Sequence, residues 1–152
     1  MPKTLRYRLF KTGAMPDALR TEIGNDEVLF SAEGVPVTVR RRGTAPGFSG
    51  RASGRFSGAF AVTNRRILAS ISRTIMVNAP YESQSANAAE VAMTPDGVHV
   101  KIDAGIHPKC TGEIEMYFKQ DFSDEDLRRF PCLRVSFDFP TPLVPKIFGV
   151  PD

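Results

Sequence analysis

The feature that most constrains this chain is an alternation of apolar and polar residues at every second position, repeated in many short segments. The clearest examples are Val98 to Ile102 (VHVKI) and Ile114 to Phe118 (IEMYF). Successive side chains of a strand point to opposite faces, so this period predicts strands with one buried face. Glycine and proline, 12 of each, separate these segments as turns separate strands in all-β proteins. The pattern predicts a mostly β fold.

Length and composition favour one soluble domain. The chain has 152 residues, of which 41% are hydrophobic and 24% charged, the balance of an ordinary globular protein. No apolar run is long enough for a transmembrane helix, and the first residues lack the apolar core of a secretory signal. Two cysteines, Cys110 and Cys132, make no disulfide framework. These observations predict a cytoplasmic location.

The predicted elements follow one another along the chain in a simple order. A short strand at Leu5–Leu9 and a helix at Pro16–Ile23 precede the main β region. Asn64 is expected in a tight hairpin turn, where asparagine tolerates the left-handed backbone conformation. Gly34 is expected to form a bulge, because the apolar positions change register there. Further strands are predicted in segments 26–39, 56–72, 74–79, 91–93, 98–102 and 114–118.

A short helix is predicted from Ser123 to Phe130. Ser123 is a good N-cap, acidic residues fill the first turn and two arginines fill the last. Pro131 ends the helix. Leu127 and Phe130 are three residues apart and can face a core together.

Residues 132–152 form an apolar, proline-rich tail. Its first part alternates and predicts one more strand at Val135–Phe139, followed by an extended segment. An exposed tail of this kind would be sticky. Three placements stay open: packing on its own domain as an added strand or strap, pairing with the sheet edge of another subunit, or binding another protein through its prolines.

Six or seven strands followed by one short helix resemble the pleckstrin-homology superfold, in particular the bacterial PH-like and GRAM-like domains. The resemblance is carried by Gly58 to Leu68 (GAFAVTNRRIL), by Asp26 to Leu29 and by Phe118 to Phe130. It implies a bent barrel of about seven strands with the helix, through Leu127 and Phe130, covering one open end. It divides the chain into an N-terminal extension (1–23), a PH-like domain (24–131) and a C-terminal tail (132–152). Such folds host lipid binders, peptide binders and assembly modules, so the fold alone does not assign a function.

Positive charge is concentrated in one part of the sequence. Residues 1–73 carry 13 Lys/Arg and 5 Asp/Glu, whereas residues 74–152 carry 7 and 12. Eight arginines lie between Arg40 and Arg73, with no acidic residue among them. The Gly/Ser/Arg-rich stretch from Arg40 to Arg55 is expected to be a long loop. The candidate ligand-binding residues are Arg40, Arg41, Arg42, Arg51, Arg55, Arg65 and Arg66.

Arginine presents a planar fork that matches phosphate oxygens, so an anionic lipid or phosphate group is the leading candidate ligand. The resemblance places this basic stretch where lipid-binding PH domains carry their basic loop, although their lysine-rich spacing is absent. Nucleic acid is the weaker alternative, because Phe48 and Phe56 could stack bases but the acidic second half would repel a long polyanion. A solvated, solubilising loop is the remaining interpretation.

Other chemistry has little support in the sequence. His107, Cys110 and Cys132 fall short of a closed zinc site, and nothing in their spacing favours a catalytic Cys–His pair over chance. Glu113 and Glu115 are expected on the outer face of a strand. We therefore expect no catalytic residue, no metal and no cofactor.

The sequence predicts a non-enzymatic PH-like binding or assembly module in the cytoplasm, with a peripheral membrane position as one option. Its partner would be an anionic membrane surface or another protein. Self-assembly through the tail and the sheet edges is the alternative, and nucleic-acid binding by the arginine-rich stretch is the second alternative.

Overall fold

In the part of the chain that the structure describes, the alternating segments form eight antiparallel strands in one sheet. The computed structural model describes residues 15–82 and 89–149. Buried and exposed side chains alternate along most strands, as the sequence pattern predicts. The strands are β1 (Val28–Ala45), β2 (Phe48–Thr63), β3 (Arg66–Ile71), β4 (Thr74–Pro80), β5 (Ala89–Thr94), β6 (Gly97–Asp103), β7 (Thr111–Lys119) and β8 (Arg134–Phe137).

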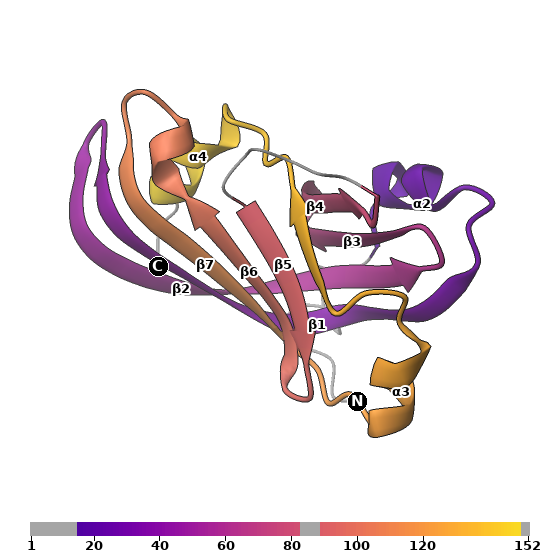
Figure 1. Cartoon of the computed structure of the whole chain (residues 1–152). Helices are drawn as coiled ribbons and strands as arrows, with labels where there is room; N and C mark the ends of the chain where they lie inside the picture. The colour runs from indigo at the N-terminus through magenta and orange to yellow at the C-terminus, as the bar shows by residue number, and fades with distance from the viewer. Residues whose placement is uncertain (1–14, 83–88, 150–152) are drawn as a thin grey trace.

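The sheet bends into a nearly closed barrel. Its strand order is β4-β3-β2-β1-β7-β6-β5-β8, and the two outermost strands, β4 and β8, approach each other across the remaining gap (Figure 1). One hydrophobic cluster fills the interior and includes residues from all eight strands. The prediction of a mostly β, barrel-like fold is confirmed, with eight strands in place of about seven.

Strand β1 changes register where the sequence predicts it. The pairing of β1 with β2 shifts between Glu33 and Val35, and Gly34 adopts a left-handed φ of 68°. A bulge inserts one extra residue, so the side chains that follow switch faces. Val35 and Val37 consequently point into the core and are almost completely buried.

Three α-helices and one 3-10 turn accompany the sheet within residues 15–82 and 89–149. Helix α2 (Asp17–Ile23) buries Leu19 completely, and 3-10 helix η1 (Ala104–Ile106) leads towards β7. Helix α3 (Asp124–Arg129) starts with a capping box in which Ser123 and Asp126 bond to each other's backbone N–H. Both predicted helices are therefore present, while the strand predicted at Leu5–Leu9 lies outside the described residues.

Aromatic rings join α3 to the barrel. Phe130 follows the helix, is 6% exposed and packs edge-to-face on Phe30 and Phe122. Phe122 in turn lies 5.9 Å from Phe60, between ring centroids. Leu127 is half-buried against the same core.

The segment after Pro131 is part of the barrel. Strand β8 pairs with β5, and its Val135 and Phe137 are buried, which is the first of the three placements considered for the tail. The expectation of an extended end is wrong, because Leu143–Phe148 forms helix α4. Residues on one side of α4 share the core, and the ring of Phe148 lies 5.2 Å from that of Phe48. The apolar residues Val144, Ile147 and Phe148 have the spacing of one helix face. The prolines around them favour an extended chain, so the sequence alone does not predict the helix.

The prediction of a long loop from Arg40 to Arg55 is also wrong. These residues form the long arms of the β1–β2 hairpin, joined by a two-residue turn at Pro46 and Gly47. Every residue from Val35 to Ala45 has a partner on β2. The glycines and serines that resemble a loop in the sequence are small residues of a paired strand, where long-range pairing outweighs weak local β propensity.

Candidate anion-binding site

Four of the predicted arginines gather on the outer face of the β1–β2 hairpin. Side chains on one face of β1 recur at every second residue, and Arg40 and Arg42 occupy the face opposite the buried valines. The register of β2 brings Arg51 directly across from Arg42. Arg55 lies on the same outer face of β2, opposite Thr38.

Arg41 lies on the inner face of the same strand. Its position follows Val37 and Val39 in the buried set, and the residue is only 4% exposed. The three consecutive arginines Arg40 to Arg42 are therefore divided between the two faces of the sheet. A loop would have left all three equally accessible.

A hollow of about 440 Å³ lies beside these arginines. Strand β7 forms its other wall, because β7 pairs with β1 along Val37–Thr44. This pairing places Glu115 opposite Arg40 and Glu113 opposite Arg42. The residues lining the hollow are Arg40, Arg41, Arg42, Arg51, Ala52, Ser53, Glu113 and Glu115.

Two glycines allow β1 and β7 to lie close together at the end of this wall. Gly43 and Gly112 face each other across the strand pair, with φ of 138° and 105°. A Cβ on Gly43 would clash with the carbonyl oxygen of Thr111, and one on Gly112 with that of Arg42. Glycine at both positions therefore holds Arg42 and Glu113 at their present separation.

Charge on the outer face is only partly balanced. Arg42 Nη2 lies 3.5 Å from Glu113 Oε2, and Lys101 Nζ lies 3.6 Å from the other oxygen of that carboxylate. Within the described residues, Arg40, Arg51 and Arg55 make no side-chain hydrogen bond or ion pair. Like charges directly opposite each other destabilise a strand pair, so Arg42 and Arg51 leave a place where an anion would relieve repulsion.

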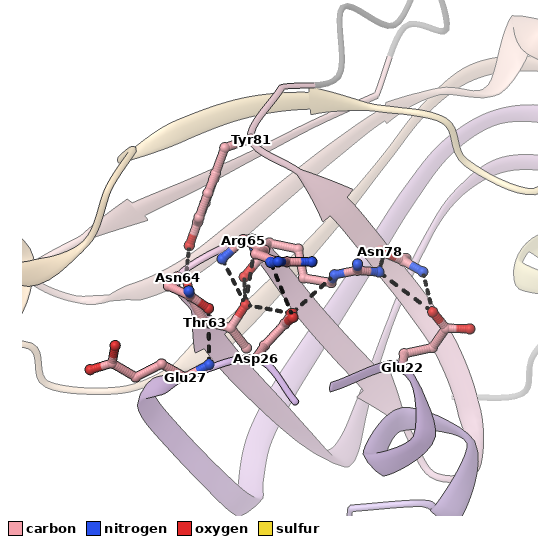
Figure 2. Close-up of polar contacts among 9 residues, drawn as sticks. Glu22, Asp26, Glu27, Thr63, Asn64, Arg65, Asn78 and Tyr81 are labelled. Carbon is pink, nitrogen blue, oxygen red and sulfur yellow. Dashed lines mark hydrogen bonds and ion pairs between the residues drawn. The ribbon is translucent and has the colours of Figure 1, made fainter. Parts of the chain in front are cut away.

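Arg65 and Arg66 lie in a different part of the molecule, where β2 ends and β3 begins. Figure 2 shows Arg65 beside Asp26. The Nε atoms of the two arginines lie 3.7 Å and 3.3 Å from the two carboxylate oxygens of Asp26. Arg66 also lies 3.5 Å from Glu22 of α2. The structure therefore separates these two arginines from the outer-face group and pairs them with acidic residues.

The hydroxyl of Thr63 organises this turn. Thr63 is fully buried, and its Oγ1 accepts hydrogen bonds from the backbone N–H groups of Arg65 and Arg66, at 3.1 Å and 3.0 Å. The same hydroxyl lies within donating distance of Asp26 Oδ2, at 3.1 Å. The Thr-Asn-Arg-Arg sequence thus folds into a turn that is closed by its own first side chain.

Asn64 contributes its side chain rather than a left-handed backbone. Among the described non-glycine residues only Ser72 has a positive φ, so the conformation expected for Asn64 is not adopted. Its Oδ1 instead accepts a hydrogen bond from the backbone N–H of Glu27, at 2.9 Å. Its own N–H donates to the Glu27 carbonyl oxygen. Asn64 thereby ties the turn to the residue preceding β1.

Tyr81 closes the opposite side of the turn. Its hydroxyl donates to the carbonyl oxygen of Thr63 at 2.6 Å (Figure 2). Burial, together with the electrostatic influence of the neighbouring Cys132 and Asp26, raises the pKa of the Tyr81 phenol well above its ordinary value of 10.0. The phenol therefore remains a hydrogen-bond donor at neutral pH.

The cysteine and histidine residues form neither an activated Cys–His pair nor a cluster of metal ligands in the described part of the chain. Cys110 Sγ lies 3.6 Å from His107 Nδ1, but burial raises the pKa of the Cys110 thiol, whereas a nucleophilic cysteine needs a lowered one. Cys132 is half-buried and free. In residues 15–82 and 89–149 no three His, Cys, Asp or Glu side chains are grouped as metal ligands would be.

His99 lies on the outer side of β6 and stacks on Tyr117, with ring centroids 4.6 Å apart. The Tyr117 hydroxyl donates to the carbonyl oxygen of Asp96 at 2.8 Å. Burial and the carboxylates of Asp96 and Asp121 raise the pKa of this phenol. These contacts connect neighbouring strands and the β5–β6 turn.

Sequence reasoning missed the part that β7 plays in the hollow. The sequence predicts Glu113 and Glu115 on the outer face of a strand, which they occupy, but it does not predict that they lie beside the arginines. The alternation of β7 identifies the face of each residue. No local signal indicates that β7 lies beside β1, so the meeting of acidic and basic residues could not be predicted.

None of the helices in the described residues is both long and apolar enough to span a membrane. Comparisons of the chain with protein-family models, with curated proteins and with solved structures gave no match.

Proposed function

We propose that the protein is a non-enzymatic binding module that holds anionic, phosphate-type groups on the outer face of the β1–β2 hairpin. The observation that carries this proposal is the direct opposition of Arg42 and Arg51 at the rim of a hollow. Two guanidinium forks can donate hydrogen bonds to the oxygens of one phosphate from two sides. The bent antiparallel barrel and the helix after β7 support a PH-like interpretation, in which such groups belong to lipid headgroups.

Glu113 and Glu115 limit the kind of anion that would bind. Their carboxylates line the same hollow and would repel a long, uniformly charged polyanion. A single headgroup or phosphate can instead lie between Arg42 and Arg51, on the side of β1 that faces away from β7 and its carboxylates. The site therefore favours a small anionic group presented at a surface over nucleic acid.

Co-sedimentation with vesicles tests the proposal. At low salt, the protein should pellet with phosphatidylcholine vesicles that contain roughly 20 to 30% phosphatidylserine, and it should stay in solution with phosphatidylcholine alone. Each arginine near an anionic membrane surface contributes about 1 kcal/mol to binding under these conditions. The double variant Arg42→Gln, Arg51→Gln should lose about tenfold or more in affinity. The double variant Arg20→Gln, Arg73→Gln removes two exposed arginines that lie outside the hairpin and is the matched control.

Equal pelleting with neutral and anionic vesicles would refute the lipid form of the proposal. Titration with inositol phosphate in place of vesicles distinguishes a free phosphate ligand from a membrane. Equal effects of the two double variants would show that only net charge matters, and would refute the site.

A further inference from the structure

Among the residues that the structure describes, half of strand β2 has no neighbouring strand on one side. Strand β1 pairs with all of β2, but β3 pairs with β2 only from Gly58 to Val62. In the described parts of the chain, no strand continues beside Phe48 to Ser57. Figure 1 shows this part of the hairpin projecting away from β3 and β4. We call it the free edge of β2.

The direction of the backbone groups along the free edge follows from the pairing. In an antiparallel ladder, the N–H and C=O of successive residues point alternately to the two sides of a strand. The Ser57 carbonyl oxygen accepts from the N–H of Ser72 and so points away from β1. Its partner on β1 is Pro36, which has no N–H to exchange.

This alternation continues without a shift to the hairpin turn, because the β1–β2 register is regular from Val35 to Ala45. Four residues of the free edge therefore direct their backbone N–H and C=O groups away from β1, as Ser57 does, and all four are exposed. They are Ser49, Arg51, Ser53 and Arg55.

The same residues carry the side chains of the outer face. Arg51 and Arg55 are four positions apart on one strand face, with Ser53 between them. An added strand would thus meet the outward N–H and C=O groups of these residues. It would also meet the side chains of Arg51 and Arg55, which make no ion pair within the described residues. Residues opposite each other on neighbouring strands lie close enough for charge pairing.

We propose that the free edge of β2 binds an extended acidic segment of another protein, which adds a strand to the sheet. Its backbone would pair with residues 49–55, and carboxylates two or four positions apart would face Arg51 and Arg55. Strand addition of this kind takes affinity from backbone hydrogen bonds and specificity from alternate side chains. The inference goes beyond the proposed anion site, because it depends on the backbone edge.

A second copy of this chain is a poorer occupant. Antiparallel self-pairing through residues 49–55 places an arginine of one copy opposite or diagonal to an arginine of the other. Like charges at such positions are destabilising. Charge complementarity therefore selects an acidic partner over self-association.

The experiment uses two labelled ten-residue probe peptides, one alternating Glu and Thr and one alternating Lys and Thr, with binding followed by fluorescence anisotropy on the full chain. The Glu peptide should bind and the Lys peptide should not. Ser53→Pro removes an outward N–H without touching the β1 ladder, and should weaken Glu-peptide binding at least tenfold. Arg51→Glu with Arg55→Glu should transfer binding to the Lys peptide.

Two measurements separate this proposal from the anion site. Ser49→Pro also removes an outward N–H, at a residue that does not line the hollow, so it should weaken Glu-peptide binding and leave vesicle binding unchanged. Arg42→Gln should weaken vesicle binding and leave the peptide unaffected. In the unmodified protein, the peptide should slow hydrogen exchange at the amides of residues 49, 51, 53 and 55, a test that needs no variant to fold. Unchanged exchange, or full peptide binding by a folded Ser53→Pro protein, would overturn the proposal. So would a dimer of the protein alone that Ser53→Pro dissociates.

Discussion

At the scale of single residues, the buried hydroxyl of Thr63 holds the β2–β3 turn together through several hydrogen bonds. It satisfies two backbone N–H groups of the β2–β3 turn and lies beside the Asp26 carboxylate. Removing one partner from a buried polar group leaves the others unsatisfied and costs free energy. The two candidate ligand-binding residues of this turn, Arg65 and Arg66, are positioned by that hydroxyl and by Asp26.

Replacing Thr63 with valine should lower the free energy of unfolding by about 1–3 kcal/mol, because the shape is kept and the hydrogen bonds are lost. Urea unfolding followed by circular dichroism measures this. Thr74→Val, at an exposed strand position, is the control and should change stability by less than about 0.5 kcal/mol. Equal effects of the two substitutions would contradict the role assigned to the hydroxyl.

The pKa of Tyr81 predicts an alkaline limit to stability. A phenol whose pKa is raised by folding keeps its proton more firmly in the native state, so its contribution is complete below the ordinary pKa of 10.0 and is lost as pH rises above it. Tyr81→Phe should cost about 1 kcal/mol at pH 7 through the lost hydrogen bond. Above pH 10 its stability should fall less steeply than that of the unmodified protein. Parallel pH profiles of the two proteins would contradict this prediction.

At the scale of elements, the site depends on how closely β1 and β7 approach. Gly43 and Gly112 face each other where a side chain on either would meet the opposite backbone. The close approach aligns the acidic residues of β7 with the arginines of β1. The hollow is therefore a product of strand pairing, not of a flexible loop.

Gly112→Ala should destabilise the protein by about 1–3 kcal/mol or more, because the added methyl group clashes with backbone at a positive φ. Thermal unfolding provides the measurement. Gly149→Ala is the control, since Gly149 has a φ of −88° and its Cβ would make only ordinary contacts. A Gly112→Ala protein as stable as the control would contradict the packing described for β1 and β7.

At the scale of the whole molecule, the C-terminal segment completes the barrel. Strand β8 covers the edge of β5 and brings Phe137 into the core. Helix α4 then packs against the inner side of the hairpin through Phe48 and Phe148. The hairpin with the arginine face and the C-terminal segment therefore support each other across the molecule.

Phe137→Ala should cost about 3–5 kcal/mol, as large-to-small changes of fully buried aromatic residues do. Leu133→Ala, in the same segment but 44% exposed, should cost much less. Comparing the denaturation midpoints of the two variants by urea titration measures the difference. Similar midpoints would show that β8 does not contribute to the core as described.

The local elements were readable from the sequence because their causes are local. The period-two patterns of β6 and β7 identified their buried faces, and Ser123 with its acidic first turn marked the start of α3. Gly34 marked the bulge of β1 by a change in the apolar register. Each of these signals depends on neighbouring residues of one segment.

The site, in contrast, was decided by tertiary structure. The sequence by itself determined that the chain is mostly β and that its arginines are concentrated between Arg40 and Arg73. Only strand pairing divided Arg40 to Arg42 between two faces, set Arg51 opposite Arg42 and brought the acidic residues of β7 beside them. The physical reason is that the alternation within one strand determines which face of the sheet a charged residue occupies. Its neighbours on adjacent strands are determined by the long-range register, which is set by burial of the apolar face.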